Sequence, residues 1–165
     1  MFVGAGWVKG ERGATEGELR AAMVGAIAKF VEWPREHRPE KEFVLGVSQD
    51  ELEKGAFGKL ENLKLQGRPV RVVAIHAQMR VAELQGCHLV FVSDPVLWKA
   101  AREVLDGQSV LLVTDIPGAA RQGAAQFQIM RQDKRLVFEV SLRAVRRGRF
   151  ELKSGLLRLA ERVYR

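Results

Sequence analysis

Cysteine and histidine often act as nucleophiles, bases and metal ligands, and this sequence holds few of them, poorly placed for catalysis. Cys87 and His88 adjoin in a predicted strand, where neighbouring side chains point to opposite faces, so they cannot form a nucleophile–base pair. We expect Cys87 to be a small buried apolar residue. His76 lies late in another predicted strand and His37 in a polar loop, and this scatter disfavours a histidine metal centre. A single cysteine also excludes an internal disulfide and a multi-cysteine zinc site.

The motifs of phosphate binding and acyl transfer are missing as well. Neither GxGxxG nor GxxxxGKS/T occurs, and the turn from Ser48 to Asp50 has an acid where a phosphate-binding loop needs glycine. No GxSxG element is present. The sequence therefore predicts a protein that is not an enzyme, with no catalytic residues, no bound metal and no cofactor.

A polar rim at the ends of the predicted strands is the candidate ligand site. Its members each end or follow a predicted strand, and they are Ser48, Asp50, Ser93 and Asp115. Ligands of open α/β sheets bind at the carboxyl ends of the strands, and two acids there would suit a small polar or cationic ligand. In the alternative interpretation, Ser93 and Asp94 only cap a helix and Asp115 only shapes the turn at residues 115–118.

The positive charge is concentrated at the carboxyl end of the chain. Residues 1–130 hold 16 basic and 16 acidic residues, whereas residues 131–165 hold 11 and 4, which accounts for the whole net charge of +7. Such a surface suits an acidic protein, anionic lipid or nucleic acid, or is simply solvated. Aromatic residues for base stacking are lacking around it, so we expect no nucleic acid. The candidate partner-binding residues are Arg143, Arg146, Arg147 and Arg149.

Trp33 is the candidate apolar contact for a partner, because aromatic side chains dominate interface energetics. The alternative is that Trp33 caps the core over the sheet, and Trp98 has the same two interpretations.

The elements that position these residues alternate between helix and strand. Apolar spacing predicts a helix over residues 18–33, with Thr15 as a possible cap and Pro34 as its end. Two further helices are predicted at 50–64, capped by Asp50, and at 95–105, capped by Asp94. Continuous apolar strands are predicted at 43–48, 70–77, 87–93 and 109–114. This pattern indicates an α/β fold, with a mostly parallel sheet of about four strands flanked by helices.

The carboxyl end departs from that alternation. Residues 125–131 and 135–141 alternate apolar and polar side chains around a turn, which predicts an antiparallel hairpin at one edge of the sheet. A short helix over 142–147 and a final helix over 154–164, capped by Ser154, are expected to follow. The length of 165 residues fits one domain, expected at 18–165 after a disordered tail or cloning remnant at 1–17.

Three stretches together resemble the YfiR family of bacterial periplasmic regulators, over about residues 18–163. They are LRAAMVGAIAKFVEWP at 19–34; GRPV at 67–70 with GCHLVFVS at 86–93; and VLLVTDIPG at 110–118 with Gly123, FEVSL at 138–142 and SGLLRLA at 154–160. Family members often carry several cysteines and disulfides, whereas this chain has only Cys87. The family's "INL" reads Val140-Ser-Leu142 here, so the asparagine is absent.

The resemblance implies a non-enzymatic periplasmic protein that binds the periplasmic domain of an inner-membrane diguanylate cyclase and represses it. Lower cyclic-di-GMP and less biofilm would follow. Family members form dimers, so a homodimer is expected, and related domains serve as inputs to membrane sensor kinases. The alternative is a periplasmic small-ligand sensor acting on such a kinase or cyclase. In the cyclase-repressor hypothesis, the four arginines are expected to face the acidic partner or the membrane, whereas the sensor alternative uses the polar rim.

Overall fold

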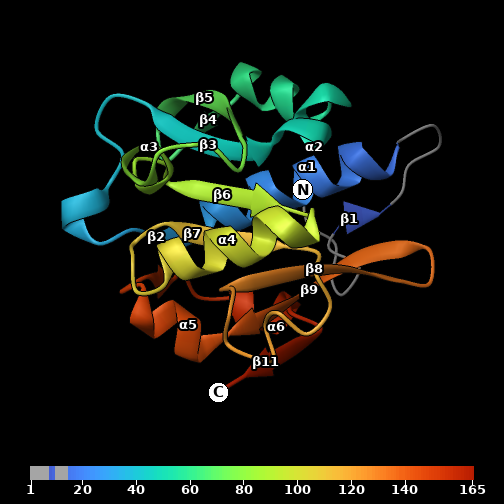
Figure 1. Cartoon of the computed structure of the whole chain (residues 1–165). Coiled ribbons are helices and arrows are strands. Elements are labelled where there is room, and N and C mark those ends of the chain that lie inside the picture. The colour runs from blue at the N-terminus through green and yellow to red at the C-terminus, as the bar shows by residue number, and fades with distance from the viewer. Residues whose placement is uncertain (1–7, 10–14) are drawn as a thin grey trace.

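A computed structural model describes residues 8–9 and 15–165 and shows a sheet with helices on both faces (Figure 1). Five parallel strands form its centre, and β9 (Arg135–Ser141) continues it antiparallel to the last of them. The parallel strands follow the order β5 (Arg68–Ile75), β3 (Phe43–Ser48), β6 (Leu89–Val92), β7 (Leu111–Thr114) and β8 (Phe127–Gln132).

Short strands cover both edges of the sheet. At one edge, β4 (Lys64–Leu65) pairs antiparallel with the start of β5. At the other, β1 (Val8–Lys9) pairs antiparallel with the first half of β9, and β11 (Arg162–Tyr164) pairs parallel with its second half. A separate ribbon joins β2 (Val31–Glu32) to β10 (Glu151–Leu152). These partners cover most of the β9 edge, whereas at the β5 edge only Arg68 and Pro69 pair with β4.

The strands are apolar throughout because both faces of the sheet are covered. Leu89 and Phe91 of β6 pack into the layer under α1 (Glu16–Lys29) and the 3-10 helix η2 (Phe57–Asn62). Val90 and Val92 pack into the opposite layer, under α3 (Val81–Gln85) and α4 (Pro95–Leu105). Figure 1 shows α4 in front of the sheet and α1 behind it. The short elements η1 (Arg35–His37), α2 (Gln49–Glu53), α5 (Leu142–Arg147) and α6 (Leu156–Leu159) complete the fold.

Much of the predicted α/β architecture is confirmed. The four predicted central strands are parallel, and the hairpin β8–β9 lies beyond them, with β8 itself parallel to β7. The Asp94 carboxylate accepts the N–H of Leu97 at 2.8 Å and so caps α4. Thr15 caps α1 in a reciprocal arrangement with Glu18. The sheet is larger than predicted, with nine strands in the described residues instead of about four plus a hairpin.

The first helix ends four residues earlier than predicted. It ends at Lys29, and residues 31–32 form β2. The backbone carbonyls at this end accept hydrogen bonds from residues far along the chain, so they do not continue the helix. Gln66 Nε2 donates to the carbonyls of Ala28 at 2.7 Å and Val31 at 2.9 Å. The N–H of Lys153 donates to Phe30 at 2.8 Å.

The continuous helix predicted over 50–64 is wrong. Ser48, and not Asp50, precedes α2, which stops after five residues, and η2 follows. Gly55 lies between them with φ at +92°, a left-handed conformation that interrupts an α-helix. Phe57 and Leu60 are buried, whereas Leu63 is 46% exposed.

The final helix over 154–164 is also wrong, because tertiary pairing overrides its helical spacing. Only residues 156–159 are helical, and β11 then pairs with the outer edge of β9. The N–H of Glu161 donates to the Phe138 carbonyl at 2.8 Å and starts that pairing. At the other terminus, residues 1–7 and 10–14 lie outside the described residues, so the expected tail and the boundary at residue 18 stay predictions; α1 begins at Glu16.

Candidate functional site

The predicted polar rim exists as an edge of the sheet but not as one site. Parallel pairing of β3, β6 and β7 brings the ends of these strands to the same edge. Ser48, however, is 3% exposed, whereas Asp50 points outward on α2. Within the described residues, no hydrogen bond joins Ser48, Asp50, Ser93 and Asp115 to one another.

A groove of about 300 Å³ at this edge contains only Asp115 of the four predicted residues. Its apolar wall comes from the turn after β7, from β8 and from β9, and consists of Pro117, Ile129, Met130 and Leu136. Its polar wall adds side chains from α1 and β8, namely Glu16, Arg20, Gln128 and Arg131. The groove therefore combines apolar surface with charges of both signs.

An ion network beside the groove holds α1 against α2. Arg20 Nη2 donates to both carboxylate oxygens of Glu51, at 2.9 and 3.2 Å, and Arg20 Nη1 donates to Glu16 at 3.0 Å. Glu51 is 2% exposed, and Lys54 approaches it to 3.5 Å from outside. Arg131 pairs with Glu16 across the groove. Arg20 Nε is buried without a hydrogen-bond partner in the described residues.

Asp115 stands apart from this network. The half-buried carboxylate forms no ion pair, and no hydrogen bond to another residue, among the described residues. Burial raises the pKa of the Asp115 carboxyl above its ordinary value, and the nearby Arg20 charge only partly offsets that effect. In the turn at 115–118, Thr114 Oγ1 accepts the amide N–H of Ile116, and the alternative in which Asp115 shapes this turn stays a prediction.

Sequence reasoning missed Arg20 and Glu51, although one signal pointed to Arg20. Arg20 precedes Val24 and Ile27 by four and seven residues, so it lies on the same buried face of α1. A charged residue on an apolar helical face needs a buried partner. The sequence does not show which acid supplies it, since Glu51 is 31 residues away.

The predicted arginine surface lies on α5 and the turn after it. Arg143 and Arg147 donate to the carbonyls of Gln122 and Gly123, at 3.2 and 2.7 Å, and Arg147 also pairs with Asp106 at 3.0 Å.

Arg149 and Arg146 complete this surface in different ways. Arg149 binds Glu36 at 2.6 Å and Ser109 Oγ at 3.0 Å. Arg146 is exposed and forms no ion pair or side-chain hydrogen bond within the described residues. Three of the four arginines therefore already bind parts of their own chain, whereas the Arg146 side chain has no such partner among the described residues.

The predicted contact role of Trp33 is corrected by its burial. The ring is 2% exposed, and its Nε1–H donates to the backbone carbonyl of His88 at 2.8 Å. Phe43 and Phe150 pack edge-on against it, with ring centroids 5.3 and 5.8 Å away. Trp33 is thus a core residue that offers no surface to a partner. Trp98 is 6% exposed and belongs to the opposite layer.

Cys87 and His88 point to opposite layers, as predicted. Cys87 is fully buried, and burial raises the pKa of its thiol to about 11, so it stays protonated. His88 Nδ1 accepts the N–H of Val44 at 2.9 Å, and its ring lies 5.1 Å from that of His37. Burial first, and then the neighbouring His37, lower the pKa of His88 to about 4.

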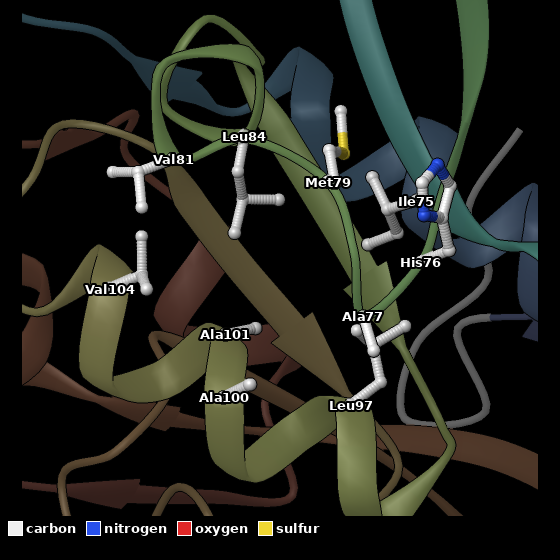
Figure 2. A pocket seen from close by; sticks show the side chains of 10 residues that line it. All are labelled: Ile75, His76, Ala77, Met79, Val81, Leu84, Leu97, Ala100, Ala101 and Val104. Atoms are coloured by element: carbon white, nitrogen blue, oxygen red, sulfur yellow. The ribbon is translucent and has the colours of Figure 1, made fainter.

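A second cavity, of about 60 Å³, lies between α3 and α4 (Figure 2). Its lining is mostly aliphatic, with Met79 and Leu84 on one side and Leu97 and Val104 on the other. His76 is at its rim, and no aspartate or glutamate lines it. The cavity therefore does not unite His76 with an acid, as an acid–base site would require.

Two kinds of feature are absent from the described residues, namely a cluster of metal ligands and a membrane-spanning helix. No group of three or more His, Cys, Asp or Glu side chains could hold a metal ion there. None of the helices in that part of the chain has the length and hydropathy that crossing a bilayer requires.

Comparison with known proteins identifies the family of this chain. No protein with curated annotation matches the chain. The sequence model of the YfiR/HmsC-like family matches residues 17–161 of the 165. The match begins one residue into α1 and ends just before β11, so it covers the central helices and strands, the hairpin and every lining residue of the candidate groove except Glu16. The chain therefore belongs to the YfiR/HmsC-like family.

Proposed function

We propose that this protein is a periplasmic regulator that binds a membrane-anchored diguanylate cyclase and represses it, lowering cyclic-di-GMP. The observation that carries the proposal is the family match over residues 17–161, nearly the full chain. The three stretches that resemble YfiR proteins lie within the matched residues and agree with it. Binding and not catalysis is the proposed activity, and a homodimer is the proposed form.

We place the partner on the arginine surface formed by Arg143, Arg146, Arg147 and Arg149. The uneven distribution of charge along the chain supports this assignment, because residues 131–165 carry the whole net charge of +7. A positive surface of this kind raises the rate of encounter with an acidic partner. Arg146 is the arginine with its charge free for such a contact, since the other three have partners in the fold.

The test captures the partner from detergent-solubilised membranes of the source organism with tagged protein, followed by mass spectrometry. We expect a membrane protein with a cyclase domain, captured more strongly at low salt. The variant Arg146→Glu should capture less of it. Lys134→Glu makes the same charge change at the exposed hairpin turn and should leave capture unchanged. Recovery of no membrane signalling enzyme at low salt would contradict the proposal.

A small-ligand sensor is the second candidate, and one observation favours it. The groove beside Asp115 has a volume of about 300 Å³ and combines apolar and charged walls, within the lower range of ligand-binding pockets. Occupancy of this groove would be transmitted to a membrane kinase or cyclase. Capture of a sensor kinase in the same experiment would favour this reading, and regulation by repression of a cyclase would then be wrong.

A further inference from the structure

The charges around the Asp115 groove are matched except for one. Glu16 pairs with Arg20 and with Arg131, and Glu51 pairs with Arg20 and Lys54. Every cation of the network is thus already used by a carboxylate other than Asp115. Asp115 lines the groove, half-buried, without an ion pair in the described residues. Partial burial without a counter-ion disfavours the ionised carboxylate, and a cation bound beside it would stabilise it.

The walls of the groove limit what this cation can be. The exposed Pro117 and the half-buried Met130 present most of the apolar surface beside Asp115, and the almost fully buried Ile129 and Leu136 contribute a small part of the same wall. A hydrated metal ion would leave this apolar surface unused. An organic cation with an apolar body would cover the aliphatic wall and place its charge at the carboxylate. The volume of about 300 Å³ restricts it to a small molecule.

We propose that this groove binds a small primary amine in its ammonium form, with an alkyl or aryl body. The ammonium donates charge-assisted hydrogen bonds to the Asp115 carboxylate, and the body lies against Pro117, Met130 and Leu136. This inference deepens the sensing alternative and rests on it for its biological meaning. Binding itself is a property of the isolated chain and does not depend on whether a cyclase is repressed.

Isothermal titration calorimetry of the full chain at neutral pH and low salt tests the proposal, with phenethylammonium and n-hexylammonium as probes. We expect both amines to bind at one site, and phenethyl alcohol, which has the same body without the charge, to bind at least about tenfold more weakly. Asp115→Asn keeps the shape and removes the charge, and it should weaken amine binding about tenfold or more. Asp133→Asn, an equal change at the exposed hairpin turn, should bind the amines like the original chain.

Two results would overturn the proposal. One is the absence of binding by both amines in the original chain. The other is equal binding by Asp115→Asn, provided that its thermal unfolding shows a folded protein. Failure of the membrane capture experiment with successful amine binding would reject the cyclase partner alone. The reverse outcome would reject the amine site alone, so the two proposals fail separately.

Discussion

The arginine surface and the Asp115 groove differ in how the fold uses their charges. Arg143, Arg147 and Arg149 account for much of the basic character of α5 and the turn after it, yet each binds a carbonyl, an acid or a hydroxyl of its own chain. Asp115 is one acid in a stretch of balanced charge, yet it has no ion-pair partner in the described residues.

This difference shows that a charged residue counted in the sequence is not always available to a partner in the folded protein. A cluster of like charges in a sequence suggests a binding surface, but in the fold its members can form hydrogen bonds and ion pairs with nearby carbonyls and acids, as Arg147 does with Gly123 and Asp106. An isolated charge is available to a ligand when every neighbouring counter-ion is already paired. Variants that remove single charged or titratable groups distinguish engaged from free charges, and they are ordered here from the largest expected effect to the smallest.

Glu51→Ala should have the largest effect, because it removes the buried partner of Arg20. Arg20 would keep only its pair with the more exposed Glu16, so we expect the free energy of unfolding to fall by about 3 kcal/mol, the lower end for a broken buried pair, in urea denaturation. Glu53→Ala, on the exposed side of the same helix, should change it by less than about 0.5 kcal/mol. A loss at Glu51 no greater than that at Glu53 would mean that the network does not hold α1 to α2.

Acidification should unfold the protein through His88, a buried titratable group at the opposite end of the strands from Asp115. Its folded pKa of about 4 lies below the unfolded value near 6.5, so the unfolded state binds more protons between these values. Stability is therefore full above pH 6.5 and falls by about 3 kcal/mol as the pH drops to 4.

His88→Phe is the matching variant for this pH dependence. It removes the titrating ring, so its unfolding free energy should depend less on pH between 6.5 and 4, whatever its stability at neutral pH. The exposed His76→Gln should keep the full dependence. Equal pH profiles for His88→Phe and the original chain would show that another group is responsible.

Arg147→Ala compared with Arg146→Ala sharpens the distinction between engaged and free arginines. Arg147 loses its bond to the Gly123 carbonyl and its pair with Asp106, so we expect a loss of about 1 kcal/mol in unfolding free energy. Arg146 has no such partner and should change stability by less than about 0.5 kcal/mol. Equal losses, measured by chemical denaturation, would remove the structural basis for singling out Arg146.

Asp115→Asn should have the smallest effect and the opposite sign. The pKa of Asp115 is raised in the fold, so ionisation of its carboxyl costs stability as the pH rises above its unfolded value. The neutral amide avoids this cost, and the melting temperature at neutral pH should rise slightly. A clear decrease would indicate that the carboxylate already has a stabilising partner, and would weaken the amine proposal as well.

The sequence predicts the centre of this fold well because local signals agree with tertiary structure there. Apolar runs such as residues 89–92 and the Asp94-Pro95 cap lead directly to β6 and α4. The periphery is less predictable, because short edge elements depend on pairing partners far away in the sequence. Residues 162–164 have helical spacing but pair with β9, and residues 31–32 pair with 151–152.

The site was predictable only in part for the same reason. Strand ends identify Asp115 as a rim residue, since parallel strands finish at one edge. The network that isolates Asp115 depends on contacts between Arg20 and Glu51 and between Arg131 and Glu16, which are 31 and 115 residues apart. Trp33 is a residue that the sequence suggested as a contact and that the fold buries. An aromatic side chain at a predicted helix end gives no indication of whether it faces a partner or the core.

The most direct test of the central claim is an assay of cyclic-di-GMP synthesis by source membranes that hold the captured cyclase. We predict that added purified protein lowers synthesis in a saturable manner, and that Arg146→Glu requires a higher concentration for the same effect while Lys134→Glu does not. Synthesis that is unchanged at saturating protein, with the protein shown to be folded, would contradict repression of a cyclase.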